Sequence, residues 1–157
     1  MAMKEGYTEP DPKIDLSGVD VARKILILAR ESGLVMELKD IENESFLSEE
    51  SLNASDNEEF FKLLKAEEHR FKEIYDSAEK NNRRLKYLAQ LEDGKAKVGL
   101  QQVDVSHPFY ELRGSDNIVL FFTGRYPEQP LIVKGAGAGA DVTASGIFAD
   151  IIRIGKK

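Results

Sequence analysis

Apolar residues recur at helical spacing near the start of the chain and alternate with polar residues further along it. Over residues 18–30 the spacing predicts a helix, and four consecutive apolar residues at 25–28 predict burial on most of its sides. Ser17 and Asp20 suit a capping box at its start. Gly33 suits the left-handed residue that ends a helix. The chain is therefore expected to place a well-packed helix close to its amino terminus.

A second helix is expected in the middle of the chain. It begins at Ser55, with Glu58 placed for another capping box, and its apolar residues keep helical spacing until about residue 81. Apolar and polar residues then alternate over 85–91, which predicts a strand. Asp93-Gly94 is typical of a two-residue hairpin turn.

The last third of the chain predicts further strands and a closing helix. The return strand of the hairpin covers 96–105, and the uniformly apolar segment 118–122 predicts a central strand buried on both faces or nearly so. Residues 131–133 predict another short strand. A glycine-alanine loop at 135–140 opens a helix over 141–154. Strands grouped between helices predict an α+β fold, with a mostly antiparallel or mixed sheet and helices on one face.

Composition narrows the function classes. The 157 residues carry 22 basic and 28 acidic side chains and no cysteine. The net charge of −6 and the lack of a basic stripe argue against a nucleic-acid partner. The apolar runs are too short for a membrane-spanning helix. The lack of cysteine excludes disulfides and thiolate metal sites and fits a reducing cytoplasm.

Four acidic residues precede Lys24 within a segment of sixteen residues near the amino terminus. They are Glu9, Asp11, Asp15 and Asp20. Asp20 and Lys24 are four residues apart and share one helix face. Because Lys24 adjoins the apolar run, we expect its ammonium to be partly desolvated and suited to proton transfer. The excess acidity suits a ligand that carries a positive charge. A surface ion pair, with Asp20 as a helix cap, is the alternative.

The glycine-alanine loop matches the strand, G-x-G-x-x-A, helix form of the dinucleotide fingerprint. The acidic residue expected about twenty positions later is missing from this chain. Six small residues would still let a flat group approach the backbone closely. Tight packing of helix on sheet is the alternative interpretation. His69 and His107 show no ligand spacing, so we expect structural or solvent-exposed histidines, no metal site and no Ser-His-Asp arrangement.

Both ends of the chain resemble one enzyme family. The segment over residues 2–24, with AMKEGYTEPDP and DLSGVDVARK, resembles the signature segment of homoserine dehydrogenases. GAGAGADVTASGIFAD, at 135–150, resembles the closing segment of that family. QPLIV at 129–133 and the acidic stretch at 40–42 are most similar to the bifunctional aspartokinase–homoserine dehydrogenases. The resemblance covers nearly the whole chain and is weaker over 44–84.

The resemblance implies a reaction and roles for particular residues. The family interconverts L-aspartate 4-semialdehyde and L-homoserine with NADPH or NADH. Lys24 matches the proton donor and acceptor of the family, and Glu9 and Asp20 match the carboxylates that hold the substrate. Asp15 matches a further acidic position of the same cluster. The glycines that match positions beside the cofactor are Gly6, Gly137 and Gly139.

The resemblance also implies an organisation. The fold resembles the carboxyl-terminal domain of glyceraldehyde-3-phosphate dehydrogenase, whose sheet often builds a dimer. Residues 1–134 would bind substrate and form a homodimer, and residues 135–157 would return to a nucleotide-binding domain that this sequence lacks. The isolated chain is then expected to be inactive and to hold no cofactor tightly. A non-catalytic module that dimerises or binds an amino acid is the alternative. The choice of NADP or NAD stays open.

Overall fold

The computed structural model describes residues 11–114, 116–137 and 139–156. The chain divides into two compact units, Met1–Asp104 and Val105–Lys157, and each is described here by itself. The predicted boundary between residues 134 and 135 concerns the roles of the two segments in an intact enzyme and stays a prediction.

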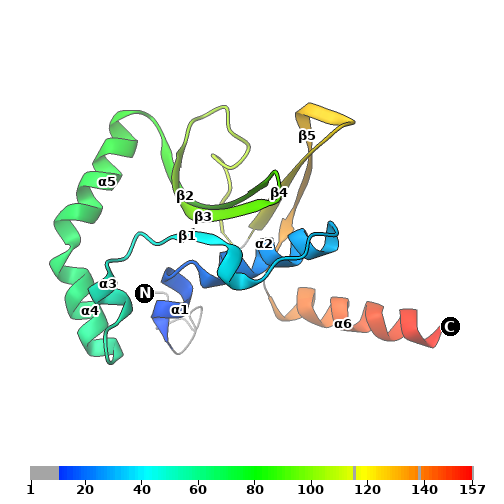
Figure 1. The fold of residues 1–157 in the computed structure, drawn as a ribbon, viewed down its shortest axis with the longest axis horizontal. Coiled ribbons are helices and arrows are strands. Elements are labelled where there is room, and N and C mark those ends of the chain that lie inside the picture. Colours follow the sequence, from blue (N-terminus) through cyan, green and yellow to red (C-terminus); the bar gives the residue numbers. More distant parts are fainter. Residues whose placement is uncertain (1–10, 115, 138, 157) are drawn as a thin grey trace. The chain divides into compact units, whose positions relative to one another are not determined.

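The first unit combines helices with a small sheet (Figure 1). Its elements in chain order are α1 (Pro12–Leu16), α2 (Val19–Glu31), the 3-10 helix η2 (Leu38–Asp40), β1 (Glu42–Glu44), α3 (Glu49–Leu52), α4 (Asn57–Ala66), α5 (Glu68–Lys80), β2 (Arg84–Glu92) and β3 (Lys95–Val103).

The sheet of the first unit is mixed, with the order β1-β3-β2. β2 and β3 are antiparallel, whereas β1 runs parallel to β3. Asp93 and Gly94 join β2 to β3 with φ angles of 49° and 75°, so the predicted hairpin turn is confirmed. The return strand ends at Val103, two residues before the predicted end.

The main core lies between α2 and the β2–β3 hairpin. The helix buries residues at helical spacing and the strand buries alternate residues; the buried set includes Ala22, Ile25, Leu26, Ala29, Ala96 and Val98. The prediction of a helix buried on most of its sides is wrong, since Ile27 is 60% exposed. The four consecutive apolar residues, 25–28, lie on more than one face of α2. The sheet covers only one face of this helix.

Two predicted helix starts need correction. Gly18, not Ser17, is the N-cap of α2, although the Ser17 hydroxyl oxygen accepts a hydrogen bond from the Val19 amide at 3.4 Å. α4 begins after Asp56, whose carboxylate accepts a hydrogen bond from the Glu59 amide at 2.8 Å. The predicted second helix is also two helices, α4 and α5, which meet at Glu67. Gly33 has a φ of 88° just beyond α2, as predicted.

The second unit contains β4 (Asp116–Thr123), β5 (Tyr126–Ala136) and α6 (Ala140–Gly155). β4 and β5 form a two-stranded antiparallel sheet. The predicted central strand is therefore wrong: β4 pairs with one strand only among the described residues, and Phe122 is 61% exposed. The closing helix is confirmed within one residue at each end. Helices and mixed or antiparallel strands together confirm the α+β class.

Candidate functional site

The candidate site centres on an ion pair on α2. Nζ of Lys24 lies 2.8 Å from Oδ2 of Asp20, one turn earlier on the helix, and both side chains are 54% exposed. The predicted desolvation of Lys24 is therefore wrong. Ala22 and Ile25 point from α2 into the core, and residue 24 falls on the opposite side of the helix.

This pair is easily rearranged. An exposed (i, i+4) ion pair contributes about 0.3–0.5 kcal/mol, because water competes for both groups. A ligand ammonium can replace Lys24 beside the Asp20 carboxylate at little cost. The Lys24 ammonium is then free to donate a hydrogen bond to another oxygen. The geometry thus offers an acceptor for a cation and a donor for a carbonyl oxygen, one helical turn apart.

The other acidic residues of the predicted cluster have different surroundings. The Asp11 carboxylate caps α1 by accepting a hydrogen bond from the Lys13 amide at 3.0 Å, and so has a structural role. Asp15 is an exposed residue of α1. Gly6 and Glu9 lie outside the described residues. The structure therefore brings together Asp20 and Lys24 from the predicted set.

Asp20 follows closely on the corner at Ser17 and Gly18, which joins α1 to α2. Lys13 anchors α1 by donating a hydrogen bond to the Ala54 carbonyl at 2.7 Å. Asn43 and Tyr87 contact the corner itself, and sequence reasoning did not identify them. The available signal was the alternation over 85–91, which puts Tyr87 on the same face as the core-packed Ala89 and Leu91.

The glycine-alanine loop holds two glycines of different character. A Cβ on Gly137 would meet the end of the exposed Asn117 side chain, which would have to move aside. Gly139 has a φ of 132° and precedes α6, and a Cβ there would meet no atom within 4 Å. The contact of Gly137 is with a side chain of β4, so packing of helix on sheet stays an alternative, whereas Gly139 leaves open space beside a helix amino terminus.

Both histidines make contacts with residues close to them in the sequence. His69 is 85% exposed, and its Nδ1 lies 3.5 Å from a Glu73 oxygen. Nδ1 of His107 accepts a hydrogen bond from the Phe109 amide at 3.1 Å, within a turn. Over residues 11–114, 116–137 and 139–156, no group of three His, Asp or Glu side chains could hold a metal ion.

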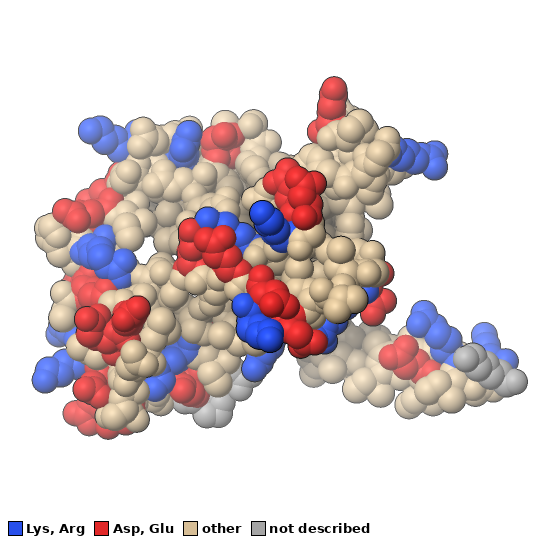
Figure 2. Space-filling model, in the orientation of Figure 1, with Lys and Arg blue, Asp and Glu red and all other residues tan. Residues whose placement is uncertain are grey.

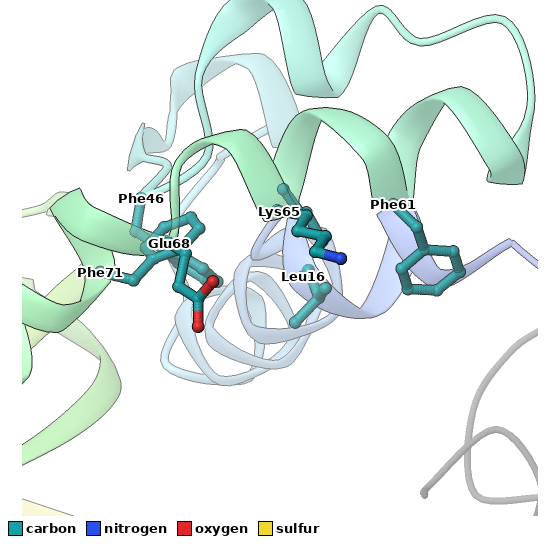
Figure 3. A pocket seen from close by; sticks show the side chains of 7 residues that line it. Leu16, Phe46, Phe61, Lys65, Glu68 and Phe71 are labelled. Carbon is teal, nitrogen blue, oxygen red and sulfur yellow. The ribbon is translucent and has the colours of Figure 1, made fainter.

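A separate apolar groove lies between α1, α4 and α5 (Figure 3). Its volume is about 510 Å³. The lining consists of Leu16, Phe46, Phe61, Leu64 and Phe71, with the charged Lys65 and Glu68. Asp20 and Lys24 are not among these residues, so the groove does not belong to the candidate site.

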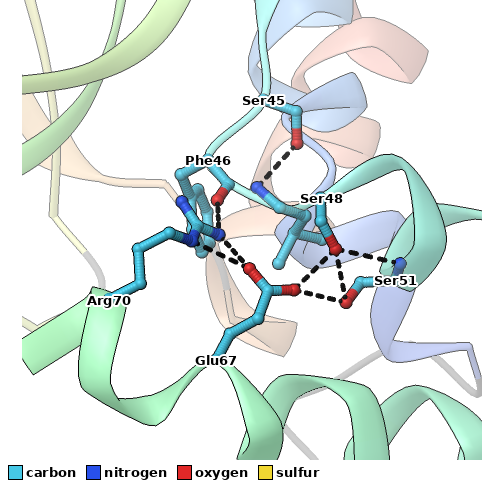
Figure 4. A network of polar contacts seen from close by, with 7 residues as sticks. Ser45, Phe46, Ser48, Ser51, Glu67 and Arg70 are labelled. Atoms are coloured by element: carbon cyan, nitrogen blue, oxygen red, sulfur yellow. Dashed lines mark hydrogen bonds and ion pairs between the residues drawn. The ribbon is translucent and has the colours of Figure 1, made fainter.

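A polar network fixes the junction of α4 and α5 to α3 (Figure 4). One oxygen of Glu67 accepts hydrogen bonds from the hydroxyls of Ser48 and Ser51, at 2.6 and 2.9 Å. The other oxygen pairs with Arg70, which also donates to the Phe46 carbonyl at 2.7 Å. The hydrogen bond from Ser48 is the main reason why the pKa of Glu67 lies below its ordinary value, and Arg70 lowers it further.

Charges of both signs intermingle on the face shown in Figure 2. No helix of the described part of the chain is long and apolar enough to cross a membrane.

Comparisons with known proteins agree on one family. The family model described as homoserine dehydrogenase matches residues 1–152. A bifunctional aspartokinase/homoserine dehydrogenase 2 of Zea mays is 47% identical over 155 residues, which are 98% of this chain and 17% of the maize protein. A homoserine dehydrogenase of Schizosaccharomyces pombe is 41% identical over 157 residues and is covered to 42% of its length.

A solved structure supports the same relationship. A hyperthermophilic archaeal homoserine dehydrogenase in complex with NADPH superposes with a TM-score of 0.64 at 25% identity. The match covers 97% of this chain and 37% of the archaeal chain. The chain thus spans less than half the length of each of these relatives.

Proposed function

Since the chain belongs to the homoserine dehydrogenase family, we propose that it forms the substrate-binding and catalytic part of an enzyme that interconverts L-aspartate 4-semialdehyde and L-homoserine. The observation that carries this proposal is the exposed Asp20–Lys24 pair on α2, with 2.8 Å between Nζ and Oδ2. A carboxylate and an ammonium one turn apart match the two polar ends that such a substrate presents. These ends are the α-ammonium group and the oxygen at C4.

The residues of the pair would act in sequence. Asp20 accepts hydrogen bonds from the substrate ammonium, together with Glu9, and thereby releases Lys24 from its ion pair. Nζ of Lys24 then donates a proton to the C4 carbonyl oxygen as semialdehyde is reduced. In the reverse direction it takes that proton from the homoserine hydroxyl. Positioned proton transfer of this kind contributes about 100- to 10,000-fold to a rate.

A nicotinamide cofactor, when bound, supplies or accepts the hydride at C4 of the substrate. Among the described residues, the start of α6 fits a nicotinamide cofactor. Gly139 offers open backbone at the start of α6, where helix amide groups favour negative charge. Gly137, beside the end of the exposed Asn117 side chain, would be a second glycine of this loop next to the cofactor. NADPH in the archaeal relative supports cofactor use in this family.

The chain would work with a nucleotide-binding half and as a homodimer. The relatives support this division, since the matched region is 17% of the maize protein and 42% of the fission yeast enzyme. We expect the isolated chain to be inactive and to bind NADP or NAD weakly. We also propose that the protein is cytoplasmic, is not attached to a membrane and has no nucleic-acid partner.

The test is homoserine-dependent reduction of NADP, with the chain alone and after addition of the nucleotide-binding half of a homoserine dehydrogenase. We expect activity only in the reconstituted enzyme, and a loss of kcat of at least about 100-fold in Lys24→Ala. Lys72→Ala is the matched control, because Lys72 and Asp76 form a second exposed (i, i+4) pair at 2.8 Å on α5. Full kcat in Lys24→Ala would refute the proton-transfer role and favour a non-catalytic module.

A further inference from the structure

The corner at Ser17 and Gly18 sets the start of α2, the helix that carries Asp20 and Lys24. Gly18 has a φ of 82°, and its carbonyl accepts the first helical hydrogen bond, from the Ala22 amide at 2.9 Å. Asp20 lies in the first turn, whose Val19 amide donates a hydrogen bond to the Ser17 hydroxyl oxygen of the corner at 3.4 Å. A small shift of this corner would therefore move Asp20 more than the residues deeper in the helix.

Tyr87 covers the corner from β2. A Cβ on Gly18 would lie 2.6 Å from Cε1 of Tyr87 and collide with its hydroxyl. The ring is itself held in an edge-to-face contact with Phe46, with 5.9 Å between centroids. The glycine and the tyrosine are thus in direct contact, which leaves the corner no room to move toward the sheet.

Asn43 joins the tyrosine to the corner. Its Nδ2 donates a hydrogen bond to the Ser17 carbonyl at 2.8 Å, and its Oδ1 accepts one from the Tyr87 hydroxyl at 2.9 Å. A tyrosine hydroxyl, with an ordinary pKa of about 10, is protonated at neutral pH and can donate, and burial, with a smaller contribution from Glu44, raises the pKa of Tyr87 further. The chain of contacts runs from β2 through β1 to the backbone that begins α2.

We infer that Tyr87 and Asn43 are positioning residues, which clamp the Ser17–Gly18 corner and thereby place Asp20 for substrate binding. This inference rests on the proposed function. The clamp acts on the first turn of α2, whereas Lys24 lies one turn deeper, beside the residues that α2 buries in the core. Loss of the clamp should therefore weaken substrate binding more than it slows the proton transfer.

The test compares Tyr87→Phe and Asn43→Asp in the reconstituted enzyme. Tyr87→Phe keeps the ring and removes the hydrogen bond to Asn43, together with a longer one of 3.4 Å to the Glu44 carbonyl. Asn43→Asp keeps an acceptor for Tyr87 and replaces the donor to Ser17 with a carboxylate. We expect kcat/KM for homoserine to fall about tenfold in each, mainly through KM, since small misplacements near a site are costly. The KM for NADP should not change.

Tyr75→Phe is the matched control, because the Tyr75 hydroxyl lies on exposed α5, 3.4 Å from Glu79. A second readout needs no activity: amide exchange of Ala22 in the chain alone should become about tenfold faster in both clamp variants. Unchanged exchange, or an unchanged KM for homoserine, overturns the inference. If the unmodified enzyme lacks homoserine-dependent activity, the proposed function fails instead, and the exchange of Ala22 still decides whether the clamp exists.

Discussion

Two glycines with left-handed backbone lie at the two ends of α2, and they differ in their surroundings. Gly18 has a φ of 82° and lies under the Tyr87 ring, whereas Gly33 has a φ of 88° and would accept a Cβ without any contact within 4 Å. A side chain at Gly33 would therefore meet backbone strain alone. A side chain at Gly18 would meet the same strain and also collide with Tyr87.

Alanine at these glycines should destabilise the chain by different amounts. Gly33→Ala should lower the free energy of unfolding by about 1 kcal/mol, which is the ordinary cost of a left-handed alanine. Gly18→Ala should lower it by about 3 kcal/mol or more, because the Tyr87 ring must also move. Urea denaturation of both variants measures the difference. Equal losses would show that Tyr87 yields freely and does not hold the corner.

At the scale of single residues, the sequence identified the Asp20–Lys24 pair but not the residues that contact the corner before α2. Asp20 and Lys24 were predictable because four-residue spacing on a helix places two side chains together. Asn43 and Tyr87 were not predictable. The hydrogen bond from Asn43 to Ser17 crosses 26 residues, and the hydrogen bond from Tyr87 to Asn43 depends on the strand order β1-β3-β2. The exposure of Lys24 was also missed, because an apolar run does not reveal which helix face the sheet covers.

At the scale of elements, Glu67 joins α3 to the junction of α4 and α5. Its folded-state pKa is lowered, chiefly by the hydrogen bond from Ser48, so the stabilisation is present at neutral pH. It is lost as the pH falls from the unfolded pKa of about 4.3 through the lower pKa of the folded state.

Glu67→Gln should therefore destabilise the chain at neutral pH only. We expect the free energy of unfolding to fall by about 1–2 kcal/mol near pH 7, because the neutral amide pairs poorly with Arg70. The difference from the unmodified chain should shrink as the pH falls through the lowered folded-state pKa of Glu67, because the carboxylate then becomes protonated as well. Glu59→Gln, which removes an exposed carboxylate held by Ser55, is the control and should change stability less. A deficit that persists at acid pH would contradict the assigned role of the charge.

The elements that sequence predicted well are those with local signals. The β2–β3 hairpin follows from alternation and Asp93-Gly94, and α6 follows from a glycine loop and an uninterrupted helical segment. The division at Glu67 was missed because residues on both sides of it keep helical spacing. The environment of β4 was missed because an apolar strand is equally compatible with burial in its own chain and with coverage by another surface.

At the scale of the whole molecule, α6 presents apolar side chains that its own unit does not bury. Phe148 is 64% exposed and Ile151 is 59% exposed, and no described side chain of the helix is buried. Contiguous exposed apolar surface of this kind marks an interaction site. We propose that the occupant is the nucleotide-binding half, to which residues 135–157 would return in the intact enzyme.

Phe148→Ser should weaken binding of the nucleotide-binding half without unfolding the isolated chain. Because the side chain is exposed, the stability of the isolated chain should change by less than about 0.5 kcal/mol. Binding of the nucleotide-binding half should weaken about tenfold or more, since a large aromatic side chain buried at an interface contributes over 1 kcal/mol. Tyr75→Ser, at an exposed aromatic residue of α5, should leave this binding unchanged. If Phe148→Ser instead unfolds the isolated chain, α6 stabilises its own unit, and the assignment of residues 135–157 to the interface is wrong.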